Sequence, residues 1–217
     1  IIRGTVVLKL WGRRETANVQ KATWCIAELG IPVDHQELGV KGTTPRDIAY
    51  LNGKTATAIP VLDDDGFVLW EGGVIARYLA AKHPESGLLP VDPQRRAETE
   101  AWMDYQLSTV RVPIHALMRD DLDPARIEFH TNELTKIMQV VEVTLADRPY
   151  LMGTDFTLAD IPLGIVSYRW FILDIERPPM PNIEAWYKRL AARPAFRETI
   201  FPPQETMVAV RDEVKIT

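Results

Sequence analysis

The sequence of 217 residues predicts an α/β domain followed by an all-α domain. Residues 1–83 alternate strand-like apolar runs with runs of helical spacing, whereas strand-like patterns nearly disappear after residue 93. Between these parts, residues 84–93 form a connector that contains proline and glycine. We therefore expect an α/β domain at 1–83, a linker at 84–93 and an all-helical domain at 94–217.

The first 83 residues predict the order β-α-β-α-β-β-α. The predicted elements are strands at 5–11 and 33–38, helices at 19–29, 45–51 and 73–83, and a hairpin at 59–70. Gly30 and Pro32 end the first helical pattern. Two apolar runs that flank Asp65 and Gly66 are typical of a hairpin. A strand–helix–strand unit followed by a hairpin and a helix indicates a mixed sheet covered by helices.

One helix start in the second half carries two local signals. Thr157 and Asp160 have the spacing of a capping box, in which the acidic side chain reaches back to the N-terminal backbone. Phe156 and Ile161 have the spacing of a hydrophobic staple. We interpret Thr157 and Asp160 as a structural cap and not as a catalytic pair.

Composition narrows the class of function. The formal charge of −5 and the absence of basic stripes argue against nucleic acid as a partner. No apolar run approaches the roughly 20 residues of a membrane helix, and no signal-peptide pattern is present, so we expect a cytoplasmic protein with no membrane partner. A single cysteine and four scattered histidines give no metal-ligand spacing, so no metal is expected.

Several strings, in the right order and spacing, resemble the glutathione S-transferase family, in particular its bacterial cytosolic members. They are LKLWGR at 8–13, NVQK at 18–21, IPVL at 59–62, WEGGVI at 70–75, FTLAD at 156–160, PNIEAW at 181–186 and RPAF at 193–196. The resemblance implies a thioredoxin-like domain that holds glutathione and a helical bundle that forms the second-substrate pocket. It also implies glutathione as co-substrate, a hydrophobic electrophile, a homodimer and a role in detoxification.

The chemistry implied by this resemblance needs a thiolate. The chain lacks a Cys-x-x-Cys pair, and Cys25 has the helical register of a packed residue, so glutathione would supply the sulfur. The resemblance places the activating hydroxyl at Thr16, and the Asn18 amide is a second donor beside a helix N-terminus. The simpler alternative is that one of these residues only caps the helix.

The resemblance also predicts the residues that bind glutathione. Pro60 is expected to follow a cis peptide bond, which turns the backbone of Ile59 toward the ligand. Glu71 is expected to bind the amino group, and the backbone of Gly72 the carboxylate, of the γ-glutamyl end. Lys54 is a candidate for the glycine carboxylate of glutathione, and a solvated surface lysine is the alternative for this residue.

Gly72 and Gly73 depart from the family pattern, which has serine and asparagine at these positions. Loss of the serine hydroxyl is expected to weaken glutathione binding by about 1–2 kcal/mol. Two successive glycines also predict a flexible start for the helix at 73–83.

Aromatic residues suggest a wall for the second-substrate pocket. Trp102 and Tyr105 lie three residues apart on one predicted helix face, and Trp170 belongs to another aromatic cluster. Aromatic residues at helical spacing are usually core residues, and this is the alternative for all three.

Three further activities remain open from the sequence. Glutathione-dependent disulfide or peroxide reduction fits the same residues, and so does glutathione-dependent isomerisation or ether cleavage. A non-catalytic assembly protein of this fold, similar to stringent starvation protein A, is the alternative from another class. Retention of Thr16, Asn18, Pro60 and Glu71 favours the transferase.

Overall fold

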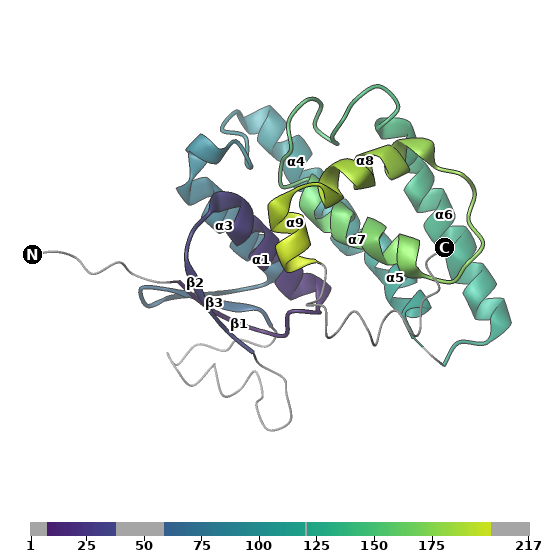
Figure 1. Ribbon diagram of the computed structural model, residues 1–217, viewed down its shortest axis with the longest axis horizontal. Coiled ribbons are helices and arrows are strands. Elements are labelled where there is room, and N and C mark those ends of the chain that lie inside the picture. The colour runs from purple at the N-terminus through teal and green to yellow at the C-terminus, as the bar shows by residue number, and fades with distance from the viewer. Residues whose placement is uncertain (1–7, 38–58, 120, 201–217) are drawn as a thin grey trace, which may run out of the picture.

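The computed structural model describes residues 8–37, 59–119 and 121–200 (Figure 1). Its strands are β1 (Leu8–Trp11), β2 (Val33–Gln36), β3 (Val61–Asp64) and β4 (Phe67–Trp70). They form one sheet in the order β2-β1-β3-β4, with β1 parallel to β2 and antiparallel to β3. The predicted mixed sheet and the β3–β4 hairpin are therefore confirmed. The helix predicted at 45–51 lies outside the described residues.

Two helices of the α/β part cover one face of the sheet (Figure 1). They are α1 (Ala17–Leu29) and α3 (Gly72–Lys82), close to the predicted bounds. Val19, Ala22 and Ile26 of α1 are buried, and the helix ends at Gly30, whose φ of 63° suits a left-handed C-cap. Arg169 of α7 donates to the carbonyl of Glu15 and to the side chain of Gln20, so the N-terminus of α1 lies at the junction of the two parts of the chain.

The rest of the described chain is helical. The elements are a 3-10 turn, η1 (Pro84–Ser86), the helices α4 (Pro93–Tyr105) and α5 (Arg111–Leu117) with the π-helical turn η2 (Gln106–Val110) between them, and α6 (Pro124–Thr144), α7 (Asp160–Ile172), α8 (Pro181–Ala191) and α9 (Pro194–Thr199). None of the helices that the structure describes is both long and apolar enough to cross a membrane. The fold class predicted from the sequence is confirmed.

Asp160, at the start of α7, has a larger role than the predicted cap. Its carboxylate accepts a hydrogen bond from the Thr157 N–H at 3.0 Å, as the capping box requires. It also accepts bonds from the Leu151 N–H and from the Trp186 indole N–H, both at 3.0 Å. Asp160 therefore connects the capping loop, the segment before it and α8. Burial raises the pKa of Asp160 to about 6, although these hydrogen bonds oppose that shift.

A partly buried ion pair joins the two parts of the chain. Arg193, which precedes α9, donates two hydrogen bonds of 2.7 Å to the carboxylate of Glu28 in α1. The Trp24 indole N–H donates to the same carboxylate at 2.8 Å, and the Arg193 guanidinium lies 3.9 Å from the centroid of the Phe156 ring. These contacts hold α9 beside α1 (Figure 1) and thereby fix the helical part relative to the sheet.

Candidate functional site

Asn18, in the first turn of α1, connects the two loops that were predicted to bind glutathione. Its side-chain Nδ2 donates to the backbone carbonyl of Ile59 at 3.1 Å. The same nitrogen donates to Oε2 of Glu71, also at 3.1 Å. Asn18, Ile59, Pro60 and Glu71, which the sequence spreads over 53 positions, therefore lie at one place.

The peptide bond between Ile59 and Pro60 is cis, as predicted. Gly12, just after β1, lies against this loop with a φ of 155°. A Cβ atom at Gly12 would lie 2.5 Å from Cγ2 of Val19 and 3.5 Å from both Cβ of Ile59 and Cα of Pro60. Glycine at this position therefore allows β1, α1 and the proline loop to meet closely.

Glu71 has an unusual backbone for a residue that is not glycine. Its φ is 71° and its ψ is 114°, in a region that side chains disfavour by about 1–3 kcal/mol. The hydrogen bond from Ile75 N to Glu71 O at 2.9 Å and the contact with Asn18 both hold this conformation. Such strain is typical of functional sites, and here it presents the Glu71 side chain beside α1.

Gly72 is required by the approach of α3 to α1. A Cβ atom at Gly72 would lie 1.8 Å from the backbone oxygen of Asn18 and 2.8 Å from its carbonyl carbon. At Gly73 the nearest atom is Nη1 of Arg77 at 3.7 Å, which is an ordinary contact. The prediction of a flexible helix start does not fit Gly72, because this residue is buried and α3 begins there. A serine at Gly72 would force the two helices apart.

The two candidate thiolate donors differ in how their hydrogens are used. Thr16 holds the N-cap position of α1, but its side chain makes no capping hydrogen bond. Its hydroxyl donates instead to the carbonyl of Arg13 at 2.9 Å, and a rotation about one bond would turn it elsewhere. Asn18 has two amide hydrogens, and its two acceptors, Ile59 and Glu71, account for both. Neither side chain caps the helix.

Cys25 lies in the core between α1 and α3. Its side chain is fully buried, with Sγ 3.6 Å from the carbonyl oxygen of Ala76. Burial raises the pKa of the Cys25 thiol to about 12. The thiol is therefore protonated and packed, in agreement with the sequence reading.

The aromatic residues predicted as a pocket wall do not meet at a cavity. Trp170 is only 1% exposed and belongs to the core, so its assignment to a pocket wall is corrected. The Tyr105 hydroxyl donates to the carbonyl of Ile137 in α6 at 3.3 Å, and Trp102 packs edge-on against Tyr105. Trp170 is therefore a core residue. The side chains of Trp102 and Tyr105 are half-buried against the same core. Lys54 lies outside the described residues.

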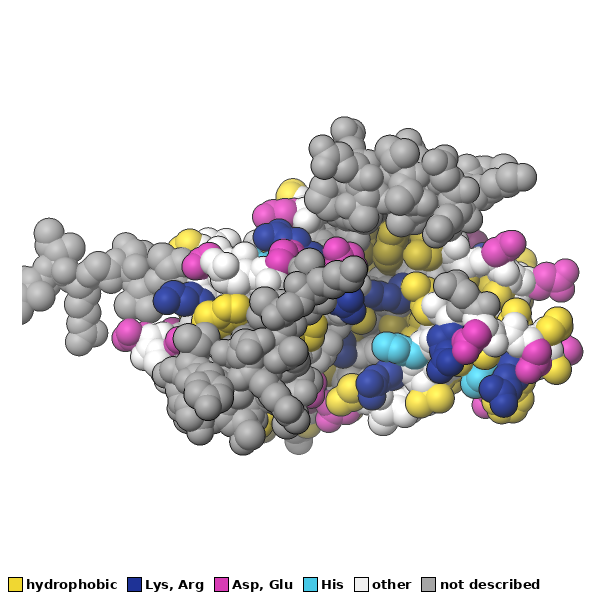
Figure 2. Space-filling model, turned by 90° about the horizontal axis from the view of Figure 1, so that it is seen from below, with side chains coloured by type: hydrophobic (Ala, Val, Ile, Leu, Met, Phe, Trp, Pro, Cys, Tyr) yellow, Lys and Arg dark blue, Asp and Glu magenta, His cyan; other side chains and the backbone are white. Residues whose placement is uncertain are grey.

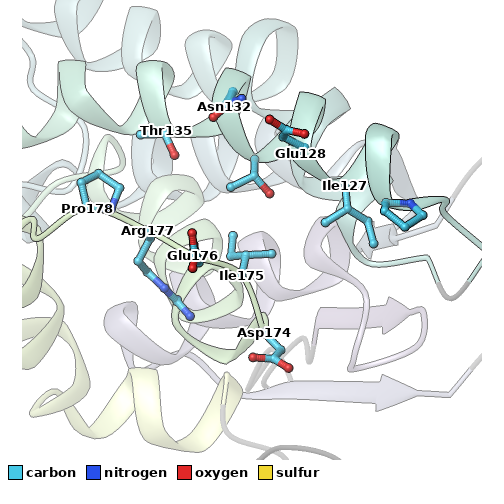
Figure 3. A pocket seen from close by; sticks show the side chains of 11 residues that line it. Ile127, Glu128, Asn132, Thr135, Asp174, Ile175, Glu176, Arg177 and Pro178 are labelled. Carbon is cyan, nitrogen blue, oxygen red and sulfur yellow. The ribbon is translucent and has the colours of Figure 1, made fainter.

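Two cavities among the described residues bear on the location of the site. The larger, of about 880 Å³, lies between α6 and the segment 174–178 (Figure 3). None of the predicted site residues lines it. The smaller, of about 490 Å³, is lined from α5 and the start of α6 by Arg111, Val112, His115, Ala116, Arg119, Asp121, Leu122, Arg126 and His130. Basic and apolar side chains also gather in a hollow of the face shown in Figure 2.

Basic residues near the site were missed by the sequence reasoning. Lys21, one turn after Asn18, is 6% exposed, and its burial lowers its pKa to about 8. Glu71 opposes this shift in the Lys21 pKa, whereas Arg111 and Arg169 add to it. Single basic residues inside helical patterns carry no local signal, so only the packing of α1, α5 and α7 reveals them together. The described residues contain no group of three or more His, Cys, Asp or Glu side chains that could hold a metal ion.

Comparison with known proteins identifies the family. Residues 6–81 match the model of the glutathione S-transferase N-terminal domain, and residues 117–194 match that of the C-terminal domain. The glutathione S-transferase GstB of Escherichia coli K12 is 31% identical over 206 residues, which cover 91% of this chain and 99% of GstB. Glutathione S-transferase 3 of Zea mays is 29% identical over 89% of this chain and 93% of its own length.

The solved structures agree with this comparison. The theta class glutathione S-transferase of Xanthomonas axonopodis pv. citri, with glutathione bound, has a TM-score of 0.78 and 35% identity. The match covers 92% of this chain and 99% of that one. Family models cover both the α/β part and most of the helical part, and a curated relative exceeds 30% identity over nearly the whole chain. The chain therefore belongs to the glutathione S-transferase family.

Proposed function

We propose that this protein is a glutathione transferase, which activates the thiol of glutathione for attack on an electrophile. The observation that carries the proposal is the junction of Asn18 with Ile59 and Glu71, two residues from the loops expected to hold glutathione. The family membership of the chain supports the same activity. In this account residues 1–83 bind glutathione, residues 84–93 link the domains, and residues 94–217 supply the second-substrate site.

Glutathione lies along the edge formed by the proline loop and the start of α3. The Glu71 carboxylate binds the amino group of the γ-glutamyl residue, with Asn18 holding the other side of that carboxylate. The free N–H groups at the start of α3 bind the γ-glutamyl carboxylate. The backbone of Ile59 pairs with the cysteinyl peptide in the manner of an added strand, and Lys54 receives the glycine carboxylate.

Thr16 is the better candidate for the thiolate donor. Both amide hydrogens of Asn18 have acceptors within the site, so Asn18 acts as a positioning residue. The Thr16 hydroxyl can leave the carbonyl of Arg13 and donate to sulfur, where the N-terminus of α1 adds a favourable field. A free thiol has a pKa of about 8.5, so lowering that pKa by about two units makes the thiolate the main form at pH 7. The released proton goes to solvent.

The transfer step follows from this thiolate. Its sulfur forms a bond with the electrophilic carbon, and the leaving group departs with the electron pair of the bond that breaks. Cys25 takes no part, because it is buried and its pKa is raised to about 12. The hydrophobic electrophile enters beside the N-terminus of α1, on the side of α5 and α7.

We also infer a homodimer that acts in the cytoplasm in detoxification. Three large apolar side chains on β4 and α3 are exposed to 38–45%. They are Phe67, Trp70 and Val74. A face of this kind, on elements next to the site, suits a second copy of the chain. Light scattering checks the mass, and Phe67→Glu is expected to give a monomer.

The test of the proposed function combines turnover and binding. Purified protein, reduced glutathione and 1-chloro-2,4-dinitrobenzene should give the thioether, followed by its absorbance, and Asn18→Ala should lose at least about tenfold in kcat/KM. Calorimetry with reduced and oxidised glutathione runs in parallel. Tighter binding of oxidised glutathione without thioether formation would favour disulfide chemistry. Absence of both binding and turnover would favour a non-catalytic role and contradict the proposal.

A further inference from the structure

Four basic side chains from three helices lie within electrostatic range of one another beside the proposed glutathione site. We call Lys21 in α1, Arg111 and His115 in α5, and Arg169 in α7 the basic cluster. Arg111 and Arg169 act electrostatically on both Lys21 and His115, which places the four groups in one neighbourhood. Lys21 also interacts with Glu71, so the basic cluster begins where the proposed γ-glutamyl site ends.

The basic cluster forms no direct ion pair with any of residues 8–37, 59–119 and 121–200, although Glu71 acts electrostatically on Lys21. No ion pair between these residues involves any of its four members. Within the part of the chain that the structure describes, the Arg169 guanidinium donates to neutral oxygens, namely the carbonyls of Glu15 and Ile165 and Oε1 of Gln20. A charge that is removed from water without a counter-charge is unfavourable. Lys21 is buried and Arg169 is partly buried, whereas Arg111 and His115 are exposed beside them. A buried lysine with basic neighbours and no direct ion pair points to an anion that arrives with a ligand.

A cavity of suitable size opens from the basic cluster. Arg111 and His115 line the cavity of about 490 Å³, together with the apolar side chains of Val112, Ala116 and Leu122. The acidic side chain in its lining, Asp121, is already bound to Arg119 by hydrogen bonds of 2.8 and 2.6 Å. This lining joins cationic groups to an apolar surface, and its volume lies in the range of small-molecule sites.

We propose that the basic cluster is an anion-binding wall of the second-substrate site, and that the electrophile is an amphipathic anion with a carboxylate next to an apolar body. This inference rests on the proposed function, whose electrophile it specifies. Arg111, which lines the cavity, receives the carboxylate while the apolar body lies along Val112 and Ala116. Lys21 does not line the cavity and adds its positive charge from behind Arg111. The sulfur of glutathione, bound beside Asn18, reaches the electrophilic carbon from the opposite end of the site.

A matched pair of electrophiles tests this preference. 4-Chloro-3-nitrobenzoate carries the carboxylate, and its methyl ester is the neutral control. With either compound the thiolate forms a C–S bond at the ring carbon that bears chlorine, the C–Cl bond breaks, and chloride leaves with the electron pair. Because the two compounds differ in intrinsic reactivity, each variant is compared with the wild type for one electrophile at a time.

Arg111→Gln removes one charge of the basic cluster at an exposed position. We expect kcat/KM for the carboxylate to fall at least about tenfold and that for the ester to fall less than about threefold. Arg111→Lys should keep most of the preference, and Lys21→Met should repeat the effect of Arg111→Gln. Arg148→Gln is the matched control, since Arg148 lies beyond the other end of α6 and pairs with Asp147.

The outcomes separate this inference from the proposed function. The anion-binding wall would be overturned, and the transferase left intact, if the variants lose equal activity with both electrophiles or lose none with either. The same holds if the wild-type protein turns over the ester but not the carboxylate. A rise in the KM for glutathione that exceeds the rise for the carboxylate would assign the basic cluster to glutathione and also overturn it. If the wild type turns over neither compound and does not react with 1-chloro-2,4-dinitrobenzene, the proposed function fails first.

Discussion

Asn18 Nδ2 lies 3.1 Å from Oε2 of Glu71 and 3.1 Å from the carbonyl oxygen of Ile59. One amide at the start of α1 thus holds both the proline loop and a strained residue at the start of α3. This arrangement explains why an asparagine occupies a position where its amide is not free to bind a ligand. It also assigns separate roles to the two candidate residues at the start of α1, Thr16 and Asn18.

Thr16→Ala is expected to raise the pKa of the bound glutathione thiol by about 1–2 units, because it removes the hydrogen bond to sulfur. Thr16→Ser keeps the hydroxyl and should keep the wild-type pKa. Titration of the ultraviolet absorbance of the thiolate in the binary complex measures both values. If Asn18→Ala raises this pKa and Thr16→Ala does not, the assignment of the two residues is reversed.

Gly72→Ser is expected to destabilise the fold by on the order of 2 kcal/mol or more, since its Cβ would lie 1.8 Å from the backbone oxygen of Asn18. It should also weaken glutathione binding, although it introduces the hydroxyl that the family pattern has. Gly73→Ser is the matched control, because the nearest atom to its Cβ is 3.7 Å away. Thermal unfolding and calorimetry check both variants. A Gly72→Ser protein that is stable and binds glutathione more tightly would contradict this steric account.

The raised pKa of Asp160 is expected to make the free energy of unfolding depend on pH. Burial raises its pKa from 3.8 to about 6, so between these values the folded state holds more protons than the unfolded state. The contribution of Asp160 to the free energy of unfolding is therefore most favourable below pH 3.8 and falls as the pH rises to about 6. The difference in unfolding free energy between the wild type and Asp160→Asn should shrink over this range by on the order of 2 kcal/mol.

Denaturant unfolding at several pH values measures that difference. Asp147→Asn, at an exposed position after α6, is the control for removal of a carboxylate at the surface. A difference for Asp160→Asn that grows with pH would mean that the hydrogen bonds from Thr157, Leu151 and Trp186 outweigh burial.

Cys25 is expected to resist thiol reagents in the native protein, because it is fully buried and burial raises its pKa to about 12. Labelling with a chromogenic disulfide should be complete in denaturant and negligible without it. Cys25→Ala should keep the wild-type pKa of the bound glutathione thiol. Rapid labelling of native protein that abolishes turnover would return Cys25 to the candidates for catalysis.

Much of the fold could be predicted from the sequence, because its signals are local. The turn at Asp65-Gly66, the C-cap at Gly30 and the spacing of Thr157 and Asp160 each depend on residues close in the chain. The structure agrees with these predictions and adds detail to them. Asp160, for example, also accepts hydrogen bonds from Leu151 and Trp186.

The site was predicted only in part, because much of it depends on packing between distant segments. The family resemblance indicated Asn18, Pro60 and Glu71, but the steric need for Gly72 appears only when α3 meets α1. Trp170 was a candidate for the pocket wall, with the core as the alternative, and burial places it in the core. The basic cluster is formed by three helices, and no pattern within any one of them predicts it.

The joint role of Asn18 and Glu71 in holding glutathione is tested most directly by a double-mutant cycle, in which calorimetry measures the affinity for glutathione. Asn18→Ala and Glu71→Ala should each weaken binding at least about tenfold, and the double variant should be little weaker than the poorer single variant. This result means that the two residues act as one unit in holding glutathione. Wild-type affinity in either single variant, or losses that add within about 0.5 kcal/mol, would contradict the account.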